Sequence, residues 1–156
     1  MTTPLKIVNL YIETDLHGPR RQDGAAMYIL ETQTSKGTAT RDKLISIPAT
    51  TEHHLVLEAM EDALGRINQS CQVEIYLSDP YIAGAIDSGL VLQWQIRDWQ
   101  TARGDPLKDA DLWAAIAGHL RRHVVTIHAG ERHGYSGWMQ EQLKRHKKST
   151  MMPKLA

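Results

Sequence analysis

Histidine is the residue type whose spacing most directly suggests chemistry in this sequence, which contains eight histidines. His119 and His123 stand four residues apart in a segment predicted to be helical, so both side chains would share one face, as in a zinc-binding pair. The sequence offers no obvious third ligand, and the adjacent Arg121 and Arg122 would disfavour a cation. The pattern leaves a zinc site and solvated histidines at a helix end as alternatives, and it favours the second.

The single cysteine, Cys71, lies just before an apolar segment. One cysteine cannot form an internal disulfide, and a thiol beside a strand-like apolar run is typically buried and unreactive. We therefore expect Cys71 to be a structural residue rather than a nucleophile.

The charged residues balance, with 18 Lys and Arg against 18 Asp and Glu, so no overall positive field attracts the chain to a polyanion. Any affinity for nucleic acid must therefore be local. The most basic stretch is 144–148, followed by Lys154, and it is consistent with phosphate contacts or, more commonly, with a solvated tail.

Length and composition predict an ordinary globular protein. The 156 residues are 42% hydrophobic, and the mean hydropathy is −0.39, so we expect one domain over residues 1–148 and a tail over 149–156. No stretch approaches the roughly 20 apolar residues of a membrane span, and MTTPLKIVNL does not resemble a secretory leader. These features favour a cytoplasmic protein with no membrane partner.

The elements that must position any site follow from hydrophobic periodicity. Alternating apolar residues and intervening turn formers predict three antiparallel strands, over 6–13, 25–34 and 38–48. A helical period then runs for about four turns from Thr51, with Thr50 or Thr51 as the N-terminal cap.

The second half of the chain alternates strands and helices. The predicted elements are a strand over 73–77, a helix from Pro80, a helix over 109–123, a strand over 124–128 and a helix from about Ser136. This order predicts an α/β domain with a mixed five-stranded sheet, three antiparallel strands followed by parallel additions, flanked by helices.

The segment WQIRDWQTARGDPLKDADLW, residues 94–113, has two tryptophans five residues apart, a Thr-Ala pair, a turn, a proline and an acidic residue before Leu-Trp. This spacing resembles the signature of the type 1 ribonuclease H family. The resemblance extends to VNLYIE with the following hairpin, to 71–82 and to HAGERHGYSGWM, and so covers nearly the whole chain. It implies a ribonuclease H-like fold, which agrees with the predicted order of elements.

The resemblance also implies cleavage of the RNA strand of an RNA–DNA hybrid by two Mg²⁺ ions that four carboxylates hold about 4 Å apart. Matched one at a time, the four positions fall on Glu13, Val56, Ser78 and Met139, so Glu13 alone keeps a charge. Asp79 stands beside Ser78, but strand alternation would turn it to the opposite face. Glu13 is therefore the main candidate for a remnant metal site. Asp79 is the second candidate, because it is the carboxylate next to the third position.

Two further features carry functional expectations from the resemblance. The family has a histidine that assists product release near its last active-site loop, and His133 matches it better than His128 does. Active relatives grip DNA with a basic protrusion, whereas here aspartates offset the cations of 97–109, and the tryptophans could instead belong to the core. The candidate nucleic-acid-binding residues are Arg20, Arg21, Trp94, Arg97, Trp99, Arg103 and Lys108.

The sequence therefore favours a catalytically degenerate ribonuclease H-like domain that binds nucleic acid, an RNA–DNA hybrid or duplex, or a protein partner. The alternative is an active Mg²⁺- or Mn²⁺-dependent ribonuclease H with a reduced carboxylate set. A histidine metal-binding protein is a third possibility. No cofactor is expected unless the domain is active, and the oligomeric state stays open.

Overall fold

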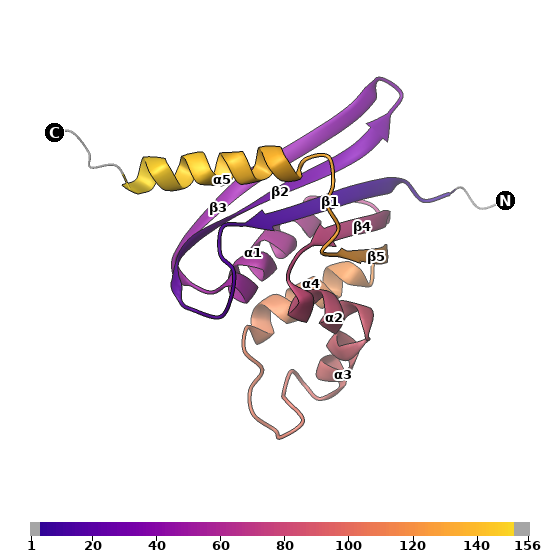
Figure 1. The fold of residues 1–156 in the computed structure, drawn as a ribbon. Coiled ribbons are helices and arrows are strands. Elements are labelled where there is room, and N and C mark those ends of the chain that lie inside the picture. Colours follow the sequence, from indigo (N-terminus) through magenta and orange to yellow (C-terminus); the bar gives the residue numbers. More distant parts are fainter. Residues whose placement is uncertain (1–3, 152–156) are drawn as a thin grey trace.

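The first part of the chain forms an antiparallel sheet, as its alternating pattern predicts. In the computed structural model, which describes residues 4–151, β1 (Ile7–Thr14), β2 (Gln22–Thr34) and β3 (Gly37–Thr50) follow one another. β2 pairs with both neighbours, and the β2–β3 hairpin extends beyond the rest of the sheet (Figure 1). The long hairpin leaves β3 as an edge strand.

Two parallel strands complete the sheet on the other side of β1. β4 (Gln72–Leu77) pairs with β1, and β5 (Val124–Ala129) pairs with β4, giving the order β3-β2-β1-β4-β5. The mixed five-stranded sheet predicted from the sequence is therefore confirmed. The carboxyl ends of β1 and β4 lie at the same edge because these strands are parallel.

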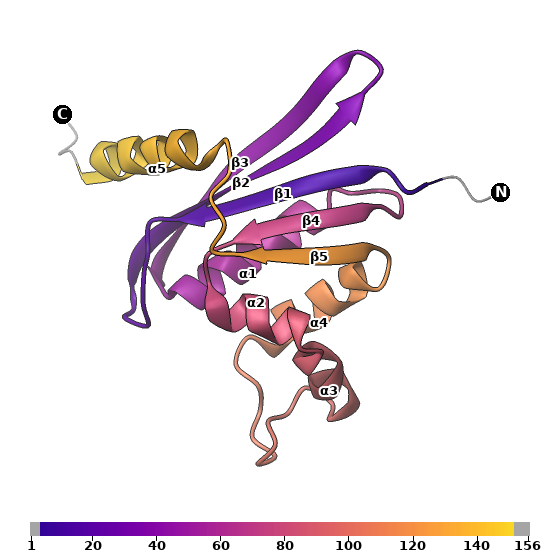
Figure 2. The same cartoon turned by 45° about the vertical axis from the view of Figure 1, so that its right-hand side comes forward.

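Helices cover both faces of the sheet, but unequally (Figure 2). α1 (Glu52–Leu64) packs against β1 and β2, and α4 (Ala110–Leu120) packs against α1. α2 (Pro80–Asp87) and α3 (Leu90–Ile96) extend this layer beyond β5. α5 (Ser136–Met151) crosses β1 and β2 on the opposite face.

α3 was not among the predicted elements. It has seven residues and begins after Gly89, whose φ of 78° suits a residue without a side chain. A helix of two turns is too short to display a clear apolar period.

Strand alternation divides the core into two clusters. Leu10 and Ile12 of β1 face α1 within the larger cluster, whereas Tyr11 faces α5 within a smaller one that includes Met139 and Leu143. α5 is thus anchored on the sheet face that α1 leaves open.

The ends of the chain modify one expectation. α5 continues through Met151, so residues 149–151 are helical rather than a tail, while Lys154 lies outside the described residues.

Cys71 is 1% exposed, and burial raises the pKa of its thiol, as expected for a structural cysteine. Within residues 4–151, no helix has the length and apolar character needed to cross a bilayer.

Candidate nucleic-acid site

A small cavity lies where the carboxyl ends of β1 and β4 meet the start of α1. Glu13 comes from β1, Val56 from α1, and Ser78 from the segment after β4. Three of the four positions predicted from the family pattern therefore line one cavity, although they are far apart in the sequence. Val56 is 3% exposed, so an apolar side chain is buried where the pattern calls for a carboxylate.

Asp79 lines the same cavity, and the expectation that it faces away is wrong. β4 ends at Leu77, so strand alternation no longer applies two residues later. The Asp79 carboxylate caps α2 by accepting hydrogen bonds from the backbone N–H groups of Tyr81 (3.0 Å) and Ile82 (3.2 Å), and its other oxygen contacts His53 Nδ1. The side chain is 0% exposed, so the protein itself satisfies this carboxylate.

The fourth predicted position, Met139, is wrong. Its side chain is 0% exposed and packs with Tyr11 and Met27 in the cluster that anchors α5. The next residue, Gln140, reaches the cavity instead and donates from Nε2 to Glu13 Oε1 at 3.1 Å. An alignment of one helix by sequence alone can slip by a residue, and a slip of one residue turns a side chain by about 100°.

Glu52 is a cavity residue that the sequence interpretation missed. It precedes Val56 by four residues on α1, so the two side chains share a helix face. Its Oε1 accepts a hydrogen bond from the backbone N–H of Gly18 at 3.2 Å. The i, i+4 spacing from Val56 was the signal available in the sequence.

His133 lies beside Glu13. Its Nδ1 accepts a hydrogen bond from the backbone N–H of Tyr135 at 3.2 Å, so the proton of the neutral ring belongs on Nε2. Nε2 is 4.0 Å from Glu13 Oε2, and the side chain is 6% exposed. Burial lowers the pKa of His133 against the opposing effect of Glu13, so the ring is neutral at pH 7.

The donor set does not fit two metal ions. Glu13 accepts a hydrogen bond from Gln140, and Glu52 accepts one from the backbone of Gly18. The oxygens of Asp79 contact the first turn of α2 and His53. Across the part of the chain that the structure describes, no group of three or more His, Cys, Asp or Glu side chains is arranged to bind a metal.

A second cavity, of about 330 Å³, brings together predicted phosphate-contacting residues from distant parts of the chain. Arg21 of the β1–β2 loop and Lys108 of the segment before α4 both line it, with Thr51 at the start of α1. Arg21 Nη1 donates to the carbonyl of Ala49 at 2.7 Å, which fixes its position. This phosphate cavity lies at the same end of α1 as the Glu13 cavity.

The remaining candidates fall into two groups. Trp94 is 5% exposed and packs against Trp113 with ring centroids 5.1 Å apart, so the prediction that Trp94 contacts nucleic acid is wrong, because the ring belongs to the core. Trp99 is partly buried against the same core. The exposed cations are Arg20, Arg97 and Arg103.

The two histidines predicted to share a helix face do not, because α4 ends at Leu120 and only His119 lies within it. His119 Nε2 lies 3.5 Å from Glu61 Oε1, whereas His123 Nδ1 accepts a hydrogen bond from the backbone N–H of Cys71 at 3.1 Å. The two rings therefore have different partners, which argues against the zinc alternative.

Comparison with known proteins agrees with this architecture, although no family model matches the chain. The chain is 34% identical over 97 residues to a ribonuclease H from Chlorobium chlorochromatii, a match covering 62% of this chain and 66% of that protein. It is 27% identical over 128 residues to a ribonuclease H from Chlorobaculum parvum, covering 82% and 84% of the two chains.

Solved structures show the same fold. The crystal structure of LC9-RNase H1, a type 1 RNase H with the type 2 active-site motif, matches with a TM-score of 0.74 and 20% identity over 96% of this chain and 75% of that one. A foamy viral protease-reverse transcriptase in complex with an RNA/DNA hybrid matches with a TM-score of 0.68 and 14% identity, covering 95% of this chain and 20% of that one. With the sheet order, the Trp94–Trp113 segment and these relatives in agreement, the chain belongs to the ribonuclease H family.

Proposed function

We propose that this protein binds RNA–DNA hybrid duplexes as a catalytically degenerate ribonuclease H-like domain. The observation that carries the proposal is the Glu13 cavity, in which Val56 and Ser78 stand where the family pattern expects carboxylates. Without those carboxylates, two Mg²⁺ ions lack the ligands that hard cations require. The surface around the cavity can still bind a duplex.

The phosphate cavity supports the nucleic-acid part of the proposal. Arg21 and Lys108 are exposed cations that line one hollow, and the Asp109 carboxylate in the same hollow contacts His54. Exposed arginine and lysine side chains contact phosphate oxygens and position a duplex without reading its sequence. The foamy viral relative in complex with an RNA/DNA hybrid supports the choice of substrate class.

Fluorescence anisotropy with a labelled hybrid at low salt tests the proposal, with duplex RNA and duplex DNA as competitors. We expect saturable binding of hybrid, weakened by Arg21→Ala and by Lys108→Ala. Lys36→Ala, which removes an exposed cation at the β2–β3 turn, is the matched control and should bind as the wild type does. If none of the three duplexes binds, the proposal is wrong and a protein partner becomes the better hypothesis.

Hydrolysis on a reduced carboxylate set is the second candidate function. The specific observation in its favour is that Glu13 of β1, Glu52 of α1 and Asp79, the cap of α2, line the same cavity. Incubation of a labelled hybrid with Mg²⁺ or Mn²⁺ tests it beside a Glu13→Ala variant. Turnover that this substitution abolishes would overturn the degenerate assignment.

A further inference from the structure

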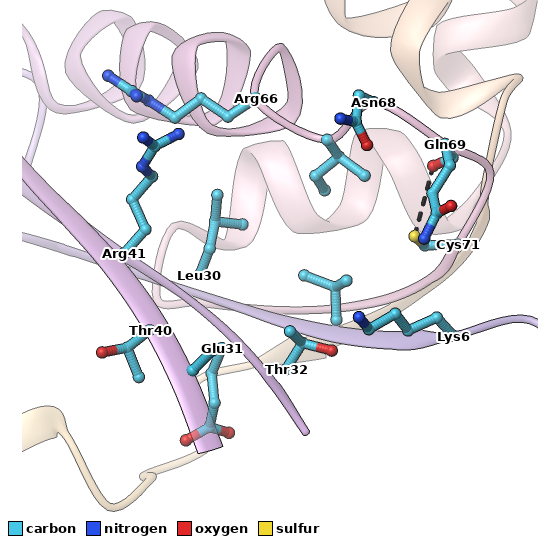
Figure 3. A pocket seen from close by; sticks show the side chains of 13 residues that line it. Lys6, Leu30, Glu31, Thr32, Thr40, Arg41, Arg66, Asn68, Gln69 and Cys71 are labelled. Carbon is cyan, nitrogen blue, oxygen red and sulfur yellow. Dashed lines mark hydrogen bonds between the residues drawn. The ribbon is translucent and has the colours of Figure 1, made fainter. Parts of the chain in front are cut away.

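A groove of about 230 Å³ lies toward the opposite end of β1 from Glu13, between the sheet and the segment that links α1 to β4 (Figure 3). Pockets for drug-sized ligands typically measure about 300–1,000 Å³, so this groove suits a smaller molecule. Its lining residues come from β1, β2, β3 and the 66–71 segment, together with Lys6 just before β1.

The floor of the groove is apolar. Val8 of β1 and Leu30 of β2 are 8% and 9% exposed, and Ile67, just after α1, is 8% exposed. These side chains belong to the larger core cluster and reach the surface at this point. The floor therefore offers apolar contact area but few hydrogen-bonding groups.

Three cations surround this floor. Arg41 of β3 and Arg66 extend their guanidinium groups toward one another, and Lys6 reaches in from the other side (Figure 3). Arg66 Nε donates to the hydroxyl of Tyr28 and also lies 3.4 Å from Asp62 Oδ2. Two neighbouring guanidinium groups repel each other unless an anion lies between them.

Nearby carboxylates neutralise only part of this charge, because Asp62 forms an ion pair with Arg66. Asp62 accepts hydrogen bonds from Tyr28 and Lys43. Glu31 accepts hydrogen bonds from Tyr11 and Tyr135, and its hydrogen bonds lower the pKa of its carboxyl even though burial acts to raise it. Over residues 4–151, neither Arg41 nor Lys6 has an ion-pair partner.

We propose that the groove binds a small amphipathic anion, with a carboxylate or phosphate head between the cations and a short apolar body on Val8, Leu30 and Ile67. The inference is independent of hybrid binding, because the groove and the Glu13 cavity share no residue. A nucleic-acid backbone would satisfy the cations but would leave the apolar floor without a partner. The apolar floor therefore favours a small ligand.

Titration of the isotope-labelled protein with octanoate, followed by two-dimensional NMR, tests the proposal, with octyl phosphate, 1-octanol and inorganic phosphate as comparison probes. We expect saturable shifts confined to β1–β3 and 66–71 with octanoate or octyl phosphate, and affinities at least tenfold weaker for 1-octanol and for phosphate. The stronger of the two amphiphiles identifies the preferred head group.

A matched control makes the test specific. Arg41→Gln should weaken binding of the amphiphile at least tenfold, whereas Lys36→Gln, which changes an exposed cation of the β2–β3 turn outside the groove, should leave it unchanged. Equal binding of 1-octanol, absence of saturable shifts, or equal losses in both variants would overturn the proposal. The proposal would also be overturned if the groove bound neither octanoate nor octyl phosphate while Arg41→Gln weakened hybrid binding. The cations would then belong to the nucleic-acid surface.

Discussion

Each carboxylate at the Glu13 cavity is held by the protein's own donors, and this separates the site from a metal centre. The Asp79 carboxylate illustrates the difference, because two backbone N–H groups and His53 occupy its oxygens. A metal ion would have to displace these partners, and a capping hydrogen bond is worth about 1 kcal/mol. At the scale of single residues, Asp79 acts as a helix cap.

Val56→Glu tests how stability responds to a carboxylate placed where the family pattern expects one. A buried charge near Glu13 and Glu52 should lower the free energy of unfolding by about 1–3 kcal/mol in EDTA, because the new carboxylate lacks a partner. Thermal unfolding measures the loss, and Val56→Gln is the control of equal size without the charge. We expect Mn²⁺ to restore stability to Val56→Glu but not to Val56→Gln; equal responses to Mn²⁺ would contradict a vacated metal position.

His128 introduces a pH-dependent contribution to stability. Its Nε2 lies 3.0 Å from Glu74 Oε1 and its Nδ1 lies 2.7 Å from Glu131 Oε2, so the hydrogen bond with Glu74, followed by that with Glu131, raises the pKa of the ring. A raised folded-state pKa contributes stability that is fully present below the unfolded value of about 6.5 and is lost as the pH rises through the folded value.

The variant His128→Gln should therefore be destabilised more at pH 6 than at pH 9, relative to the wild type. Denaturant unfolding at the two pH values measures this difference. His17→Gln, which replaces an exposed histidine, provides the control. A difference between wild type and His128→Gln that does not change with pH would contradict the assignment of the ion pairs.

At the scale of elements, two helices begin beside the Glu13 cavity. α1 begins at Glu52 after the Thr51 cap, and α2 begins at Pro80 after the Asp79 cap. Helix N-termini carry partial positive charge, which stabilises nearby anions. The clustering of three carboxylates at this point therefore has an electrostatic explanation that does not require a metal.

The docking of α5 decides which of its side chains belongs to the cavity. Met139→Ala should lower the free energy of unfolding by about 2–5 kcal/mol, because it opens a void in the cluster beneath α5. Gln140→Ala should cost about 0.5 kcal/mol or less, since the residue is exposed. Denaturant unfolding of the two variants measures both values, and the reverse ranking would contradict the placement of α5.

At the scale of the whole molecule, the equal numbers of acidic and basic residues make hybrid binding depend on local cations. Each phosphate contact contributes about 0.9 to the slope of log affinity against log salt concentration on B-form DNA. Arg21→Ala and Lys108→Ala should each reduce the magnitude of that slope for the hybrid by about 1.

Anisotropy titrations across a range of salt concentrations measure these slopes. The losses should be the same for hybrids of different sequence, because phosphate contacts do not read bases. Unchanged slopes in both variants would remove the phosphate cavity from the binding surface.

The sequence by itself determined the family and most of the fold. These predictions rest on local patterns, which can be recognised without knowing which distant residues come into contact. The patterns are the strand alternation of 6–13, the helical period after Thr51 and the Trp94–Trp113 spacing. α3 was not predicted from the sequence, because its two turns contain too few residues to show a helical period.

Tertiary structure decided which side chains meet. Glu52 joins Glu13, Asp79 turns inward as a cap, and Gln140 replaces Met139, because each depends on where an element ends or how it packs. Arg21 and Lys108 share a cavity for the same reason. Side-chain direction changes by about 100° for each residue of a helix, and strand alternation stops where the strand does, so a sequence pattern alone leaves such positions uncertain by a residue.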